Sequence, residues 1–549
     1  MKIRVLILFA GCLGSLITAT HTLQTDQAIL YSNFADRPSV KRVAVIGAGS
    51  AGSSAAHYLR KYSDDLAMPI NITIFERNAY IGGRSTTVNA YDDPLKPVEL
   101  GASIFVEVNR NLVQAAKEFN LSTSSLSHVR TRLGNDAPIL GVWNGKEFVV
   151  TQSAGNSWWN NAKLLWKYGL APIRTMRLMR GTVSKFFSMY DEPCFPFADL
   201  TQVAYDLGLT AVTAVTGEQY LREHGIADLF AREIIQASTR VNYAQNLPLI
   251  HGLETMVCMA TDGAMAVEGG NWQMFEGMVQ ASRADVRLQT QVTALDELEN
   301  GTYLVRSVAT DSATAAQDRQ EELFDTIILA APYQFSNITI NSPLAHVPDK
   351  IPYVTLHVTL FASPHLLSPA AFNLPPGQAV PQIILTTLPA DEPASARPDG
   401  VGSPGFFSIS LLQPTTNDRH SPPRPEYLYK IFSPDRVNAT FLSRILGLDR
   451  TSDLAEDDDD DELVAADDVS WLYRKVWQSY PYEYPRVTFE KLRLSGARRG
   501  NGIWYTAGIE SLISTMETSS LMGMNVARLI ADEWVEEGEE EEKVRGLWR

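Results

Sequence analysis

The stretch VAVIGAGSAG, residues 43–52, decides the fold. A short apolar run leads into Gly47, Gly49 and Gly52, and an alanine-rich helical pattern follows. Gly47 permits a tight turn, Gly49 lets the backbone approach a phosphate, and Gly52 lets the helix pack closely on the strand. The N–H groups at the start of the helix, which begins at Ser50, then face the phosphate charge. The pattern predicts a strand, a glycine turn and a helix that bind the pyrophosphate of a dinucleotide.

A second predicted strand, residues 71–76, completes one βαβ unit and ends in a carboxylate. Glu76 can accept hydrogen bonds from both hydroxyls of a ribose, and it would repel a 2′-phosphate, which disfavours NADP. Arg77 follows directly. A second glycine turn, Gly82-Gly83-Arg84, brings a cation that can reach the phosphates from the other side.

The spacing from Glu76 to Gly82-Gly83-Arg84 resembles that of the flavin amine oxidase superfamily. The segment ELGA at 99–102, with Gly101 and Ala102, resembles the next flavin-contacting segment of that group. Near the other end, YTAGIE at 505–510 and METS at 516–519 resemble the strand and helix that close over the flavin. The resemblance implies that FAD is the cofactor, and it adds Gly508, Glu510, Met516 and Glu517 to the cofactor-binding residues.

Two internal segments, RVNYAQ at 240–245 and VEGGN at 267–271, resemble the prenylcysteine oxidase (prenylcysteine lyase) family. With the flavin motifs, the resemblance covers most of residues 42–535. It implies an FAD-dependent thioether oxidase in prenylated-protein degradation. Such an enzyme cleaves farnesyl- or geranylgeranylcysteine with O2 and water to cysteine, a prenyl aldehyde and hydrogen peroxide. The flavin performs the difficult step, so few acid–base residues are needed.

The cysteine end of such a substrate carries an ammonium and a carboxylate. Arg240 could pair with the carboxylate, Glu268 with the ammonium, and Asn242 could orient either group. Alternatively, Arg240 and Glu268 are structural and pair with each other or with the backbone. The nine histidines are scattered without a zinc-like spacing, so we expect no metal site.

These motifs predict an α/β protein with a discontinuous Rossmann-type FAD-binding domain and a mixed α+β substrate-binding domain. The FAD-binding domain is expected in residues 42–150, 261–340 and 501–535. The substrate domain is expected in residues 151–260, which are predicted to be helical, and in residues 341–500. Within the latter part, a Pro-rich stretch (363–425) and an acidic run (456–462) resemble insertions in long loops, and 536–549 reads as an acidic tail.

The N-terminal segment 1–20 has basic residues before a short apolar run, which predicts a signal peptide, with a signal anchor as the alternative. The secretory pathway, a lysosome or vacuole, or the extracellular space is therefore expected. Sequons mark Asn120, Asn300, Asn337 and Asn438 as glycosylation candidates, whereas a glycan at Asn71 would fit badly at the edge of a buried strand. Cys194 and Cys258 form one disulfide or remain free thiols.

The formal net charge of −16 argues against a nucleic-acid partner. Residues 157–190 combine tryptophans, leucines and methionines with lysines and arginines and contain no acid, and Pro172 divides them into two helices. Their apolar face packs into the substrate domain, or the segment is a basic amphipathic surface that makes peripheral contact with anionic lipid.

Two other functions compete with the thioether oxidase. A flavin amine oxidase acting on another substrate shares the terminal motifs but does not require the segments at 240–245 and 267–271. A non-catalytic prenyl-binding protein, like the Rab GDP-dissociation inhibitors, uses a related fold without flavin chemistry. The intact glycine pattern and Glu76 argue against this second alternative.

Overall fold

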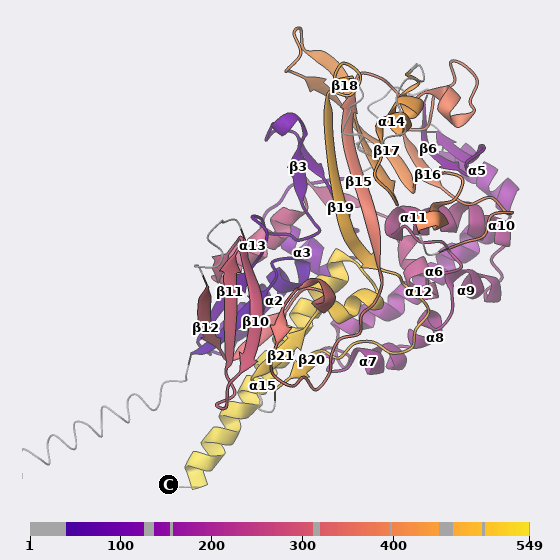
Figure 1. Cartoon of the computed structure of the whole chain (residues 1–549). Helices are drawn as coiled ribbons and strands as arrows, with labels where there is room; N and C mark the ends of the chain where they lie inside the picture. Colours follow the sequence, from indigo (N-terminus) through magenta and orange to yellow (C-terminus); the bar gives the residue numbers. More distant parts are fainter. Residues whose placement is uncertain are drawn as a thin grey trace, which may run out of the picture.

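The computed structural model describes residues 40–125, 137–153, 157–310, 319–395, 398–448, 465–496 and 500–547. The predicted signal peptide and the acidic run at 456–462 lie outside these residues. Figure 1 shows a Rossmann-type body, a tall antiparallel sheet above it, and a group of helices beside both.

A six-stranded sheet forms the centre of the cofactor-binding domain, in the order β20–β21–β13–β1–β2–β9. Its strands are parallel except β20, which is antiparallel to β21. The strands are β1 (Lys41–Ile46), β2 (Ile70–Phe75), β9 (Asp285–Arg287), β13 (Thr326–Leu329), β20 (Arg493–Ser495) and β21 (Gly502–Tyr505). Because segments from the start, middle and end of the chain meet in one sheet, the domain is discontinuous, which confirms the predicted fold class.

The two faces of this sheet are covered by different layers. Val43 and Val45 of β1 pack with the helical layer, whereas Ala44 and Ile46 pack toward a four-stranded sheet, as the alternation of a strand requires. The helices are α2 (Ser50–Asp65), α3 (Arg110–Glu118), α13 (Trp272–Ser282) and α15 (Met516–Leu547). The second sheet, in the order β12–β11–β10–β14, contains β10 (Thr290–Glu297), β11 (Tyr303–Ala309), β12 (Gln320–Phe324) and β14 (Thr339–Ile340).

A larger sheet, in the order β19–β15–β18–β17–β16–β6–β7, forms the substrate domain. Its strands are β6 (Pro138–Trp143), β7 (Phe148–Ser153), β15 (Tyr353–Ser363), β16 (Ile383–Thr386), β17 (Ser408–Asn417), β18 (Arg424–Ser433) and β19 (Trp471–Pro481). The assignment of residues 42–150 to the cofactor domain was therefore wrong for its last part, since β6 pairs with β16 through Leu140 and Ile383. The expectation of long loops over 363–425 was also wrong in part. Pro414 is accommodated inside β17, close to a register shift at Leu411/Gln413.

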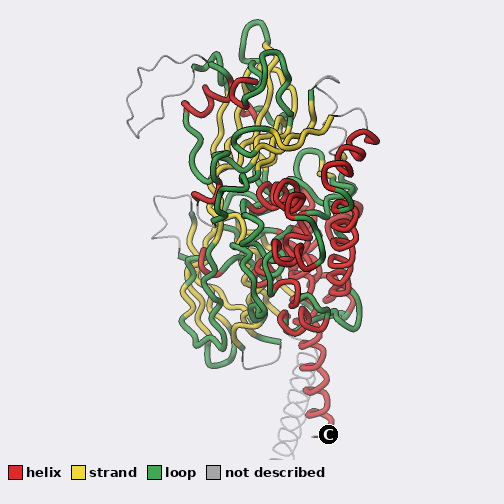
Figure 2. The backbone as a smooth tube through the Cα atoms, turned by 90° about the vertical axis from the view of Figure 1, so that its right-hand side faces the viewer, coloured by secondary structure: helices red, strands yellow, loops and turns green. Residues whose placement is uncertain are grey.

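Helices cover one side of this sheet, as Figure 2 shows in red. They include α5 (Ser157–Tyr168) and α6 (Ala171–Phe187), with Pro172 in the first turn of α6 as predicted. The others are α7 (Leu200–Asp206), α8 (Thr210–Thr213), α9 (Gly217–Glu223), α10 (Asp228–Phe230), α11 (Gln236–Tyr243) and α12 (Gly252–Cys258). Smaller elements are the pairs β3 (Thr87–Asn89) with β4 (Pro97–Glu99) and β5 (Thr123–Ser125) with β8 (Met265–Val267), and α14 (Ala439–Leu446).

The C-terminal helix α15 continues to Leu547, so the residues predicted to form an acidic tail extend the helix instead (Figure 1). Its acidic part is tied to the body where Lys41 Nζ lies 2.6 Å from a carboxylate oxygen of Glu537. No helix in the described residues combines the length and the apolar character needed to span a membrane.

Helix α15 approaches α2 so closely that a glycine is required between them. A Cβ atom on Gly523 would lie 2.2 Å from the carbonyl oxygen of Ala51. The same contact is fixed by the Ser54 hydroxyl, which donates to the Ser520 carbonyl at 2.7 Å, and by the Ser50 hydroxyl, which donates to the Met516 carbonyl at 2.6 Å. The first turn of α2, which carries the predicted phosphate-binding groups, is therefore held in place by α15.

We predict that Gly523→Ala destabilises the folded protein by about 1–3 kcal/mol, because the added methyl group forces α2 and α15 apart. Gly538→Ala on the same helix is the control, since a Cβ atom there would have no neighbouring atom within 4 Å. That variant should gain up to ~1 kcal/mol from helix propensity. Chemical denaturation measures both, and equal effects of the two substitutions would contradict the close contact.

Candidate cofactor and substrate site

The glycine turn after β1 and the carboxylate after β2 form one unit. Gly47 has a φ of +105° and donates its N–H to the Phe75 carbonyl at 2.8 Å. Glu76 Oε2 accepts the N–H of Ala48 at 2.9 Å, and its Oε1 accepts the N–H of Asn78 at 2.8 Å. Oε1 also accepts the side-chain amide of Asn78 at 2.6 Å, so the further lone pair is on Oε2. Buried Glu76 is thus fixed against the turn and can still accept a ligand hydroxyl.

The start of α2 is open for an anion. Its N-cap is Gly49, which provides no side chain to bind the N–H groups of the first turn. Gly52 packs so tightly that a Cβ would lie 1.9 Å from the Gly47 carbonyl oxygen. The helix therefore begins directly at the turn, as the glycine spacing predicts.

The second glycine turn lies against the first. Gly49 and Gly82 form a parallel β-bridge, and the Gly82 N–H donates to the Ala48 carbonyl at 2.9 Å. A Cβ on Gly83 would lie 3.2 Å from the Gly49 Cα. The predicted approach of residues 82–84 to the first turn is thus present, and any side chain here would close the gap between the two loops.

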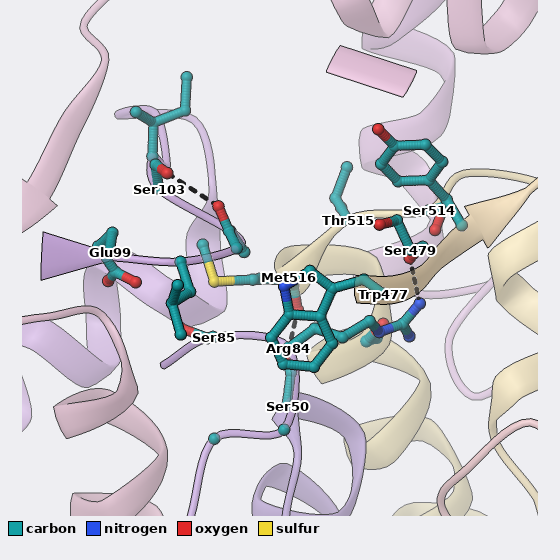
Figure 3. A pocket seen from close by; sticks show the side chains of 18 of the residues that line it. Ser50, Arg84, Ser85, Glu99, Ser103, Trp477, Ser479, Ser514, Thr515 and Met516 are labelled. Atoms are coloured by element: carbon teal, nitrogen blue, oxygen red, sulfur yellow. Dashed lines mark hydrogen bonds between the residues drawn. The ribbon is translucent and has the colours of Figure 1, made fainter. Parts of the chain in front are cut away.

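Arg84 and Glu510 join the two ends of the chain in an ion pair, with Nη2 2.5 Å from Oε1. Arg84 also donates to the Ser479 carbonyl, which Figure 3 shows as a dashed line, and the Tyr353 hydroxyl donates to Glu510 at 3.1 Å. The coulombic pull and hydrogen bonding of Glu510 outweigh burial and raise the pKa of Arg84. The predicted cation and acid are therefore both present but bind each other.

Glu517 has a contact that the sequence did not predict. Its carboxylate accepts the N–H groups of Asn111 and Leu112 at the start of α3, at 2.9 and 3.0 Å. The Tyr190 hydroxyl donates to the same carboxylate at 2.6 Å. Glu517 thus caps α3, and its role as a cofactor ligand has no support in this geometry.

A single cavity of about 1670 Å³ joins these groups. This exceeds the ~300–1,000 Å³ usual for one small ligand, so there is room for a cofactor and a second molecule. All predicted cofactor-binding residues line it except Gly52 and Gly508, which pack behind it. The lining members are Gly47, Gly49, Ser50, Glu76, Arg77, Gly83, Arg84, Gly101, Ala102, Glu510, Met516 and Glu517.

Beyond the cofactor residues, the cavity extends between the large sheet and the helices. Alternate residues of neighbouring strands face it, so its wall on the sheet side is mainly apolar. The sheet contributes Leu140, Leu356, Val358, Ile383, Leu385, Leu412, Leu428 and Phe432, and helices α6 and α12 contribute Val183, Phe186, Phe187 and Val257. An extended apolar chain fits this part of the cavity.

Of the predicted substrate-binding residues, only Asn242 lines the cavity, and its amide donates to the Ser238 carbonyl at 2.9 Å. Arg240 is fully buried and lies outside the cavity lining. Glu268 is exposed at the surface and is also absent from the lining. The predicted contacts of Arg240 and Glu268 with substrate are therefore wrong.

Arg240 is instead a structural residue that joins α11 to the large sheet. Its guanidinium donates to Thr386 Oγ1 at 3.0 Å, Asn246 Oδ1 at 2.7 Å and the carbonyls of Gly400 and Val401. It also lies over the Phe407 ring, 5.4 Å from the centroid. These contacts satisfy the buried cation without a carboxylate, which is the structural alternative left open by the sequence.

Lys430 on β18, which no sequence motif indicated, lines the cavity together with Glu99 at the end of β4, the first residue of the ELGA segment. Lys430 Nζ donates to the Glu99 carbonyl at 2.8 Å and to Ser103 Oγ at 2.9 Å. Burial lowers the pKa of Lys430 and raises that of Glu99. A signal was present, since Lys430 occupies an inward position between Leu428 and Phe432, where alternation predicts an apolar side chain.

Several polar atoms in the cavity wall are buried without a partner. They are Ser85 Oγ, Glu99 Oε2 and Trp477 Nε1. Figure 3 shows Glu99, Ser103 and Ser85 on one side of the pocket and Ser479 and Ser514 on the other. Buried polar atoms are normally hydrogen-bonded, so these positions suit a bound polar molecule. Together with the open N-terminus of α2 and Glu76, Ser85 Oγ and Trp477 Nε1 fit a dinucleotide cofactor.

Behind the cavity wall, His251, Glu254 and Glu483 form a fully buried cluster. His251 Nδ1 accepts the N–H of Glu254 at 3.1 Å, so the neutral ring carries its proton on Nε2, which lies 3.5 Å from Glu483 Oε2. A metal would need the Nε2 lone pair, which this tautomer does not offer. Burial, followed by repulsion from Glu483, raises the pKa of Glu254 to about 8, so the carboxyls retain a proton at neutral pH.

The predicted glycosylation candidates lie at the surface of the protein. Asn120, Asn300, Asn337 and Asn438 are exposed, and so is Asn71, contrary to expectation. Cys194 and Cys258 are free thiols.

Entry into the secretory pathway stays a prediction, because residues 1–20 lie outside the described part of the chain.

Stability should fall as the pH rises from about 5 to about 8, because the folded state holds the Glu254 proton more tightly than the unfolded chain does. Glu254→Gln removes this group, so the thermal midpoint should fall less over the same range. Glu223→Gln, at an exposed position of α9, is the matched control and should leave the dependence unchanged. Identical pH profiles for wild type and Glu254→Gln would contradict the buried proton.

The fold and the cavity together define a dinucleotide-binding protein with a Rossmann-type domain and a separate substrate domain. In agreement, a family model described as an NAD(P)-binding Rossmann-like domain matches residues 45–119. A model described as prenylcysteine lyase matches residues 151–543. The chain belongs to the prenylcysteine lyase family, which confirms the family predicted from the internal motifs.

Characterised relatives extend over nearly the whole chain. The farnesylcysteine lyase of Arabidopsis thaliana is 28% identical over 503 residues, covering 89% of this chain and 87% of the relative. Prenylcysteine oxidase 1 of Mus musculus is 26% identical over 521 residues, covering 91% and 90%. Among solved structures, a putrescine oxidase triple mutant with redesigned cofactor binding superposes with a TM-score of 0.50 at 15% identity, covering 89% of this chain and 98% of that one. This last similarity concerns the fold alone.

Proposed function

We propose that the protein is an FAD-dependent oxidase that cleaves S-prenyl-L-cysteine. The overall reaction converts the thioether, O2 and water into cysteine, a prenyl aldehyde and hydrogen peroxide. The observation that carries the proposal is the single cavity, which joins a dinucleotide-binding turn to a long apolar wall. Family membership and the names of the relatives support the same substrate class.

Different residues of the cavity would bind different parts of FAD. The N–H groups at the start of α2 would donate to the pyrophosphate, and Glu76 would accept from a ribose hydroxyl. The second glycine turn leaves room for the cofactor beside the first. FAD held here would supply the redox chemistry, hydride acceptance from the carbon next to sulfur and electron transfer to O2.

The protein's own part in the reaction is positioning. The apolar residues of the large sheet and α6 hold the prenyl chain and exclude water from it, while the substrate sulfur stabilises positive charge on the neighbouring carbon. Water replaces the lost hydride at that carbon, and the resulting hemithioacetal separates into thiol and aldehyde. The cavity needs no strong base for this sequence, which agrees with the pairing of Arg84 with Glu510 and the capping role of Glu517.

Anaerobic mixing of the purified protein with farnesylcysteine tests the proposal. The flavin absorbance near 450 nm should bleach and should return when O2 is admitted, with formation of hydrogen peroxide. Cofactor released by denaturation should be identified as FAD by mass. Spermine and leucine serve as control substrates and should leave the absorbance unchanged.

The outcomes separate the competing functions. Bleaching by spermine or leucine but not by farnesylcysteine would favour a flavin amine oxidase. A colourless protein that binds farnesylcysteine would favour a non-catalytic prenyl-binding protein.

We also propose that α5 and α6 dock on an anionic lipid surface from which prenyl substrates enter. Buried Met179 and Phe186 face the protein, yet a second set of apolar side chains is exposed: Leu165, Trp166, Leu170, Ile173 and Met176, with Trp166 91% exposed. Exposed basic residues surround this set: Lys163, Lys167, Arg174, Arg177, Arg180 and Lys185. Apolar and basic side chains together are typical of membrane-surface helices. Because Val183 and Phe187 of α6 also line the cavity, a lipid-bound substrate would have a short path inward.

Replacing Arg174, Arg177 and Arg180 together by glutamate should abolish sedimentation with vesicles that contain anionic lipid. Trp166→Ser should weaken the same binding, because the exposed indole no longer inserts at the interface. Vesicles of neutral lipid are the control and should bind the wild type much less. Unchanged sedimentation of the triple variant would contradict the docking surface.

A further inference from the structure

Lys430 is a buried cation whose direct hydrogen-bond acceptors are uncharged. It occupies the middle of β18, it is 7% exposed, and Leu428 and Phe432 flank it on the cavity face. Its two acceptors are the carbonyl of Glu99 and the hydroxyl of Ser103. An ammonium has three N–H donors, so one remains for a ligand. Glu99 is the charged residue that interacts with Lys430 electrostatically, but the direct contact of Lys430 is with the Glu99 carbonyl, so the remaining N–H can bind an anionic group.

Glu99 offers the opposite charge on the same side of the cavity. Its Oε1 accepts the N–H of Asn271 at 2.6 Å, whereas its Oε2 is buried without a partner. The residue lies next to Gly101 and Ala102, the segment expected at the flavin. Figure 3 shows Glu99 and Ser103 close to each other at this side of the pocket. A cation and an anion, each with unused hydrogen-bonding capacity, thus lie together at one place.

The other charged residues of the inner cavity are already neutralised or lie elsewhere. Arg84 and Glu510 bind each other, and Glu517 caps α3. Lys475 on β19 is only partly buried and lies over the Trp477 ring, 4.7 Å from its centroid, whereas Lys430, which lies over the Phe432 ring at 4.9 Å, is buried. Lys430 and Glu99 are therefore the pair whose charges the cofactor-binding contacts leave unexplained.

We propose that Lys430 and Glu99 form the subsite for the zwitterionic end of the substrate, an α-amino acid, with Lys430 binding the carboxylate and Glu99 the ammonium. The inference rests on the proposed function. The carbon that is oxidised is joined directly to sulfur, and the amino-acid group is only a few bonds away, so this group must lie close to the flavin. The apolar chain then extends along Leu428, Phe432 and the facing helices. This subsite takes the role that Arg240 and Glu268 do not fill.

The test compares substrates that differ only at the charged end: farnesylcysteine, S-farnesylcysteamine, which lacks the carboxylate, and N-acetylfarnesylcysteine, which lacks the ammonium. Anaerobic flavin bleaching gives a dissociation constant for each. Wild type should bind farnesylcysteine ~10-fold to 100-fold more tightly than either analogue, since each analogue loses a charge-assisted hydrogen bond. Wild type that binds all three equally would overturn the inference without any variant.

The variants assign each charge to its residue. Lys430→Met should reduce the preference for farnesylcysteine over S-farnesylcysteamine to near onefold, and Lys430→Arg should restore most of it. Glu99→Gln should reduce only the preference over the N-acetyl compound. Lys475→Met, which removes a lysine from the same cavity, is the matched control and should keep both preferences.

Two other outcomes would assign Lys430 to the cofactor or would reject the proposed function. If Lys430→Met keeps the full preference while shifting the flavin spectrum or potential, Lys430 serves the cofactor and the inference is overturned. If no prenyl thioether bleaches the flavin of wild type, the proposed function itself fails, which is a distinct result.

Discussion

The contact between two glycine turns is the constraint on which the rest of this structure depends. Gly49 and Gly82 are bridged, and Gly52 lies against the Gly47 carbonyl with no space for a side chain. This arrangement sets where α2 begins, and it brings Glu76 against the turn through the Ala48 N–H. Helix α15 then holds α2 from the other side, through Gly523 and the Ser50 and Ser54 hydroxyls. The phosphate-binding groups are thus rigid because backbone meets backbone on both sides of them.

The second organising feature is the large sheet, which closes the cavity opposite these turns. Its inward residues are mostly apolar, so the cavity offers an extended lining with few charges. Polar groups occur where the sheet meets the cofactor domain, at Lys430, Glu99 and the Arg84–Glu510 pair. A molecule with a long apolar chain and a charged end matches this division. The same polarity explains why a flavin enzyme here needs few acid–base side chains, since most of the cavity only positions the substrate.

Local patterns predicted the elements that depend on neighbouring residues. The glycine turn, β2 with Glu76 directly after it and the break at Pro172 follow from local spacing, and the final strand and helix follow from the resemblance of residues 505–519. Predictions failed where pairing between distant segments decides. β6 joins β16 across more than two hundred residues, and β17 contains a proline, so neither strand was recognisable in isolation. The helical state of residues 536–547 was missed because a glutamate-rich segment can be a solvated coil or, when it extends an anchored helix, helical.

By itself, the sequence determined that this protein has a Rossmann-type cofactor domain, and it placed the chain in its family through short internal motifs. The first conclusion rests on glycines and a carboxylate whose roles depend on backbone geometry within one βαβ unit. Only the tertiary structure decided which charged residues face the substrate. Arg240 lies within a family motif, yet its guanidinium is satisfied by Asn246 and two carbonyls, whereas Lys430 lies in an ordinary strand and faces the cavity. Whether a buried charge is structural or available to a ligand depends on its three-dimensional neighbours, which the linear sequence does not specify.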